Sequence, residues 1–203
     1  TKRDDDGIRL FPDGRRLEFT IETAGENTEE TDILDLLKPD FIDVGIKIYP
    51  RSTQRDVFRR RILAGQTVMS AWAGMDNALV TSDMEPDALA PTSSAQFQWP
   101  RWGQFIESSG REGERPALAE VNALVRLYEE WRMSSTREQR RAIWHKMLAI
   151  NAEQLYTIGV INSTLQPIVV SNDLRNVPEK GLYSFEPGAF IGRYMPDTFW
   201  FDR

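Results

Sequence analysis

The stretch Ile46–Trp72, IKIYPRSTQRDVFRRRILAGQTVMSAW, decides the fold of this chain. Its two ends, Ile46–Tyr49 and Thr67–Trp72, are short, rich in apolar and β-branched residues, and read as strands. A helical pattern of about a dozen residues lies between them, long enough for a crossover connection. We therefore predict a βαβ unit with parallel strands and a right-handed crossover.

The helix inside this unit has recognisable ends. Ser52 or Thr53 can cap its first turn, because a short hydroxyl side chain accepts from the unpaired backbone amides there. Phe58 and Ile62 share one face, and Gly65 follows the last apolar position, where a left-handed residue commonly ends a helix.

Upstream of this unit, the pattern predicts a hairpin. Ile8–Phe11 and Arg16–Thr23 flank Pro12-Asp13-Gly14, in which proline presets a turn and glycine tolerates positive φ. Apolar and polar residues alternate through the second run, so we predict a half-buried strand there.

A helix should connect this hairpin to Ile46. Asn27 or Thr28 can cap it, Pro39 should kink or split it, and Gly45 supplies its left-handed exit. The positions expected to face the core are Ile33, Leu36, Leu37, Phe41 and Val44.

Downstream, regular patterns fade over residues 73–116, apart from a short helix predicted around Ala95–Glu107. So long an excursion within a compact domain favours a functional role near a cleft mouth. Two amphipathic helices follow, at 117–132 and from a Ser135–Glu138 capping box to about Gln154. Tyr156–Ile161 and Pro167–Val170 read as strands, and residues 181–203 as largely extended.

Composition excludes several functions. The net charge of −6 disfavours nucleic-acid binding, and the Arg59-Arg60-Arg61 run is interpreted as the solvated face of a helix. The chain has no cysteine and no apolar run long enough to cross a membrane. We expect neither a metal nor a cofactor.

No catalytic constellation stands out. The single histidine, His145, falls in an amphipathic helix and is interpreted as a surface or half-buried residue. Carboxylate pairs such as Asp83 and Glu85 are expected by chance in a chain with 31 acidic residues. We therefore predict that the protein is not an enzyme.

Trp72 and the residues after it form the candidate ligand site. Trp72 ends a predicted parallel strand, and ligands gather at the carboxyl ends of such strands. Gly74, Met75, Asp76 and Asn77 follow, so an indole face, a carboxylate and an amide could line a cleft. The alternative is a core tryptophan followed by an ordinary loop.

Two further tryptophans lie in the excursion. Trp99 and Trp102 could add stacking surfaces for a ligand, or could fill the interior of their own loop.

The order of these patterns resembles one lobe of the family-five extracellular solute-binding proteins, the peptide- and nickel-type receptors of ABC importers. The resemblance spans nearly the whole chain, and its specificity lies in the order and spacing of its parts. These are Pro12-Asp13-Gly14, Leu17–Ile21, Asp43–Ile48, Leu63-Ala-Gly65, Ala71-Trp72, the two late helices, Tyr156–Ile161 and Pro167–Val170.

This resemblance implies a type II periplasmic-binding-protein-like α/β lobe with helices packed on a mixed sheet of about five strands. Residues 1–203 would form the C-terminal lobe, with the missing partner lobe mainly upstream. The opening Thr1–Gly7 lacks an initiator methionine and a signal sequence, so we expect an excised fragment. The implied protein is monomeric and periplasmic, captures a peptide or other small polar solute, and delivers it to a membrane permease.

One departure affects the ligand. Peptide-binding members carry an aspartate just after the strand-end tryptophan that pairs with the peptide ammonium. Met75–Leu79 stands there instead, and Asp76 serves only after a one-residue shift. An oligosaccharide stacked on Trp72 is therefore an alternative ligand. The alternative functions are a cytoplasmic sensor fused to a DNA-binding domain and, less favoured, a carbohydrate hydrolase.

Overall fold

The computed structural model describes residues 2–25, 28–75, 81–162, 164–185 and 189–202. The chain divides into two compact units, one formed by residues 1–72 and 91–122 and the other by 73–90 and 123–203. Each unit is described separately below.

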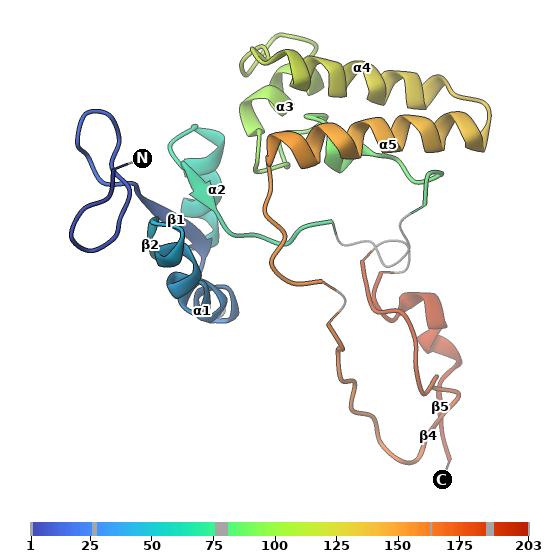
Figure 1. Ribbon diagram of the computed structural model, residues 1–203. Helices are drawn as coiled ribbons and strands as arrows, with labels where there is room; N and C mark the ends of the chain where they lie inside the picture. Colours follow the sequence, from blue (N-terminus) through green and yellow to red (C-terminus); the bar gives the residue numbers. More distant parts are fainter. Residues whose placement is uncertain (1, 26–27, 76–80, 163, 186–188, 203) are drawn as a thin grey trace. The chain divides into compact units, whose positions relative to one another are not determined.

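The first unit is built on a parallel sheet of three strands in the order β2-β1-β3. β1 (Glu18–Ala24) pairs in parallel with both β2 (Lys47–Thr53) and β3 (Met69–Ser70). The predicted unit of strand, helix and parallel strand is confirmed, with α2 (Arg55–Leu63) as its helix. β2 and β3 flank β1 and do not pair with each other, and β3 is shorter than predicted (Figure 1).

β1 is more buried than its alternating sequence predicts. Its last four residues, Ile21 to Ala24, are all buried, including Glu22 and Thr23. A strand between two others, with a helix on each side, has no solvent face at this end, so the half-buried prediction was wrong here.

The two helices pack on opposite faces of the sheet. Ile21 contacts Leu34 of α1 (Glu29–Asp43), whereas Ala24 contacts Phe58 and Ile62 of α2. Ile21 and Ala24 point to opposite sides because side chains alternate along a strand. Full burial of an aromatic or branched aliphatic side chain such as Phe58 stabilises the fold by about 1.5–3 kcal/mol.

Helix α1 differs from the prediction in two ways. It continues through Pro39, so it is not split there; the proline lies near the end of the helix and on its exposed side, and removes a single helical hydrogen bond. Leu36 is 78% exposed and Leu34 is the buried residue, so the predicted inward face was wrong at this point.

Glycines end both of these helices as predicted. Gly45 has φ +82° and Gly65 has φ +68°. After α1, the Gly45 amide donates to the carbonyl of Ile42 and the Ile46 amide to that of Phe41, a Schellman arrangement that satisfies the terminal carbonyls.

The N-terminal hairpin is reduced to a turn closed by one antiparallel bridge, Leu10–Arg16, ahead of β1.

Within the excursion, α3 (Pro100–Glu107) confirms the predicted short helix and contacts α2. A 3-10 turn, η1 (Asp87–Leu89), belongs to the second unit.

The second unit centres on two helices, α4 (Ala119–Met133) and α5 (Arg137–Gln154), which run side by side in opposite directions (Figure 1). The capping box of α5 is formed by Thr136 and Gln139, one residue beyond the predicted Ser135–Glu138 pair. Leu148, an apolar residue of α5, is 45% exposed.

Residues 81–90, which we call the strap, lie along these helices. Arg140 of α5 pairs with Asp83 at 3.3 Å. Three side-chain N–H groups of the helices donate to strap carbonyls, namely Trp131 to Ser82, Trp144 to Met84 and Asn151 to Leu89, at 2.9–3.1 Å. The strap is therefore fixed to the helices by direct polar contacts along its length.

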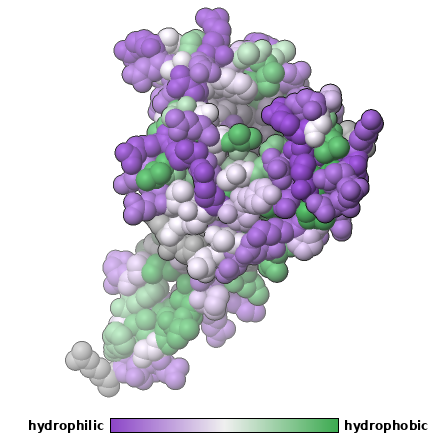
Figure 2. Space-filling model, turned by 90° about the vertical axis from the view of Figure 1, so that its left-hand side faces the viewer, coloured by the Kyte–Doolittle hydropathy of each residue, from purple (hydrophilic) through white to green (hydrophobic). Residues whose placement is uncertain are grey.

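The C-terminal part contains a small antiparallel pair, β4 (Leu174–Arg175) with β5 (Trp200–Phe201), and the 3-10 turns η2 (Gly192–Tyr194) and η3 (Pro196–Thr198). The strands predicted at 156–161 and 167–170 are absent, because these segments have no pairing partner in the described part of the chain. The described strands thus form two sheets and not one sheet of five. Apolar side chains gather over this C-terminal segment at the bottom of Figure 2.

Candidate functional site

The candidate site lies where the three parallel strands end. β1 ends at Ala24, which is paired in register with Thr53 at the end of β2, and β3 ends at Ser70. Because the strands are parallel, these ends lie along one edge of the sheet, the edge at which open α/β sheets bind ligands. α2 begins at this edge with Arg55, and the chain leaves β3 through Trp72.

Trp72 lies two residues beyond β3 and is part of an aromatic cluster. Its ring centroid is 5.6 Å from that of Phe58, with an interplanar angle of 29°, and 5.1 Å from that of Phe97. The Arg55 guanidinium carbon lies 5.2 Å from the indole centroid. The residue remains 37% exposed, so Trp72 is neither a core residue nor an isolated surface residue.

Arg55 and Trp72 thus place a cation against a partly exposed indole ring. Phe58 and Phe97 support the ring from inside, and Arg55 adds a cation–π contact that fixes its orientation. Nearby on β2, the buried Thr53 hydroxyl has no hydrogen-bond partner among the described residues. Such an edge can hold an anionic group against the guanidinium and an apolar or sugar ring against the indole.

The loop after Trp72 contains the other predicted contacts. Gly74 and Met75 are exposed, and no atom of the described residues lies within 4 Å of a Cβ built on Gly74. Asp76 and Asn77 lie outside the described residues. Gly74 and Met75 are thus related to Trp72 only because they follow it in the chain.

The two tryptophans of the excursion differ in accessibility. Trp99 is 3% exposed and its indole N–H donates to the Gln96 side chain at 3.0 Å, so it fills the interior of its own loop. Trp102, on α3, is half-buried.

A buried carboxylate, Glu22, stabilises the sheet next to the site. Glu22 on β1 accepts hydrogen bonds from Arg61 of α2 through both oxygens, at 2.8 Å each, and from Arg51 of β2 at 2.7 Å. These hydrogen bonds, first those from Arg61, outweigh the effect of burial and lower the pKa of Glu22 from its ordinary value. The side chains of Glu22, Arg51 and Arg61, which we call the Glu22 triad, thus link β1, β2 and α2 near the candidate site.

Neither Arg55, Phe97 nor the Glu22 triad was identified from the sequence. The spacing of Arg55 and Phe58, three residues apart at the start of α2, could have suggested that both reach the same neighbour. Phe97 and the partners of Glu22 come from distant parts of the chain, and no local pattern identifies them.

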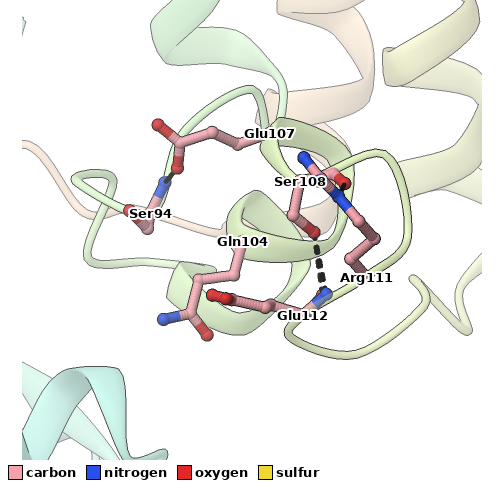
Figure 3. Close-up of a pocket in the computed structure, with 6 residues that line it drawn as sticks. All are labelled: Ser94, Gln104, Glu107, Ser108, Arg111 and Glu112. Carbon is pink, nitrogen blue, oxygen red and sulfur yellow. Dashed lines mark hydrogen bonds between the residues drawn. The ribbon is translucent and has the colours of Figure 1, made fainter.

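Two open pockets lie elsewhere. One in the first unit, about 390 Å³, is lined by polar residues of α3 and adjoining loops, including Ser94, Glu107 and Arg111 (Figure 3). Glu107 accepts from the Ser94 backbone amide, so this carboxylate already has a partner within the pocket wall. The other, about 490 Å³, lies in the second unit beside Arg141 and His145 of α5.

The described residues also bear on metal binding and on the single histidine. They contain no group of three or more His, Asp or Glu side chains placed to hold a metal ion. His145 is exposed on the surface of α5, where the sequence placed it. Within the described part of the chain, no helix is both long and apolar enough to cross a membrane.

No family model and no curated protein matches the chain. Solved structures do. An oligopeptide-binding protein, OppA, matches with a TM-score of 0.71 and 26% identity over 100% of this chain and 33% of that one. The chain thus spans about a third of the length of that protein.

Two further structures share the fold at lower identity. The periplasmic binding protein MelB from Agrobacterium fabrum C58, in complex with stachyose, matches with a TM-score of 0.58 and 16% identity over 78% of this chain and 23% of that one. NikA from Brucella suis, in complex with Fe(III)-EDTA, matches with a TM-score of 0.51 and 15% identity over 74% of this chain and 27% of that one.

OppA and MelB are binding proteins, and the NikA structure holds a bound Fe(III)-EDTA complex. Their fold is that of type II periplasmic binding proteins, as the sequence predicted. The resemblance to the family-five solute-binding proteins is confirmed: the chain has the fold of part of such a protein.

Proposed function

We propose that this chain is the C-terminal lobe of a two-lobed, extracytoplasmic solute-binding protein that serves an ABC importer. The observation that carries the proposal is the match of the entire chain to part of an oligopeptide-binding protein. The edge of the sheet formed by the carboxyl ends of its strands also supports the proposal. A half-exposed indole and a cation lie there, and such an edge is suited to face a ligand.

The proposed mechanism involves no chemical reaction. The solute binds between this edge and the partner lobe, and closure follows because the closed form contacts the solute on both sides. The permease would then receive the closed, loaded form. Trp72 and the loop residues Gly74, Met75, Asp76 and Asn77 are the proposed contacts, with Arg55 added from the structure.

The proposed solute is a peptide or another small polar molecule. The oligopeptide-binding relative favours a peptide, and the Arg55 guanidinium offers a partner for a carboxylate. The indole of Trp72 is equally suited to a sugar ring, and the stachyose complex of MelB shows that this fold also accommodates an oligosaccharide.

Native mass spectrometry of the full-length protein, purified without added ligand, tests the proposal and names the solute class. We expect a co-purified small molecule, and titration calorimetry with that molecule should then show one saturable site. Trp72→Ala and Asp76→Ala should each weaken binding. If both variants bind like the wild type, the site assignment is wrong; if no solute binds the full-length protein, the function is wrong.

A further inference from the structure

Two aliphatic runs after α5 lie exposed to solvent, outside any helix or strand. They are residues 157–161 and 167–170, which we call the first and second aliphatic runs. The exposed fractions in the first run are 61% at Ile158, 50% at Val160 and 55% at Ile161. In the second run they are 53% at Ile168, 95% at Val169 and 43% at Val170.

Their backbone also lacks pairing within the described part of the chain. Within the described chain, neither run belongs to a strand or forms a backbone hydrogen bond with another segment. Isoleucine and valine favour strands because their branched side chains pack well on a pleated surface. A sequence of this kind, with neither a ladder partner nor a covered face, lacks the contacts that its composition favours.

The runs also lack the features that protect a permanently exposed strand. Native edge strands usually carry charged residues, above all lysine, that oppose pairing with another chain. Residues 155–172 contain no Asp, Glu, Lys or Arg. Such an uncharged aliphatic segment is typical of one that is covered in the working protein.

We infer that both aliphatic runs are strands that pair with, and bury their side chains against, the remainder of the two-lobed receptor. This inference rests on the proposed function. The occupant follows from the comparison: OppA matches the whole of this chain, yet two thirds of that protein lies outside the match. That remainder is the part able to supply the missing strands.

Hydrogen–deuterium exchange on the full-length receptor tests this pairing. Amides of Ile158–Ile161 and Ile168–Val170 should exchange at least about 100-fold more slowly than expected for an unstructured chain, as paired strands do. The protection should not change with protein concentration. Exchange at the unstructured rate would overturn the inference, and so would protection that appears only on dimerisation, since a second copy would then be the partner.

A matched pair of variants separates pairing from general destabilisation. Val160→Lys lies in the first run and should reduce protection across that run at least about tenfold, because a buried lysine opposes strand docking. Leu165→Lys, between the runs and 97% exposed, should leave protection unchanged. Equal effects of both variants would contradict the inference.

Calorimetry on the same samples distinguishes this inference from the proposed function. Solute binding together with unprotected runs would retain the function and reject the pairing. Protected runs in a protein that binds no solute would retain the pairing and reject the function.

Discussion

Glu22 is the residue whose burial most depends on distant partners. Its side chain is 4% exposed and contacts two arginines, so loss of its charge leaves both guanidinium groups without their anionic partner. Glu22→Gln should lower the free energy of unfolding at neutral pH by about 1.5–3 kcal/mol, the range for hydrogen bonds to charged groups. Chemical denaturation checks this, with Glu18→Gln on the exposed part of β1 as control.

The same residue predicts the direction of a pH effect. The pKa of Glu22 is lower in the folded state than its ordinary value of 4.5, so its contribution is present above pH 4.5 and is lost as the pH falls through the folded pKa. The stability difference between wild type and Glu22→Gln should therefore shrink on acidification. A difference that stays constant down to acid unfolding would contradict this role.

Arg55 makes a prediction about the ligand. Arg55→Gln removes the cation beside Trp72, and a solute carrying a carboxylate should bind about tenfold or more weakly, since a charge-assisted hydrogen bond contributes about 1.5–3 kcal/mol. Calorimetry with the free acid and its amide checks this. Arg60→Gln, exposed on the same helix, is the control; loss of affinity for the amide as well would show a structural role.

At the scale of elements, α3 depends on close backbone contact. A Cβ built on Gly103 would lie 2.1 Å from the carbonyl oxygen of Ser93, so any side chain there must separate α3 from its own preceding loop. Gly103→Ala should lower the unfolding free energy by about 1–3 kcal/mol, as for other overpacked sites. Gly74→Ala, at a position with open space, should have little effect; thermal unfolding of both variants compares them.

Elements formed by local patterns were the ones that the sequence predicted well. α2, α4 and α5, and the glycine exits at Gly45 and Gly65, follow from the spacing of apolar residues and from backbone conformation within a few residues. The capping box of α5 shifted by one residue because Ser135–Glu138 and Thr136–Gln139 both fit the same pattern.

Features that depend on distant partners were predicted less well. The end of β1 is buried on both faces because two helices and two strands surround it, and its sequence pattern contains none of that information. Trp72 was proposed as a site residue from its position at the end of a predicted strand, whereas Arg55 and Phe97 required the fold. The aliphatic runs have the composition of strands, but the described chain offers them no partner.

At the scale of the whole molecule, the proposed function makes this chain one side of an enclosing surface. A single lobe presents an open edge, and small-molecule sites usually bury most of the ligand. The edge at Trp72 is half-exposed here, as a surface that awaits a second lobe should be. High affinity is therefore expected of the two-lobed protein and not of residues 1–203 alone.

Small-angle X-ray scattering of the full-length protein, with and without its solute, tests whether the solute is captured between two lobes. We expect the radius of gyration to fall on saturation, because the lobes close over the bound molecule. An unchanged radius at saturating solute would contradict capture between lobes.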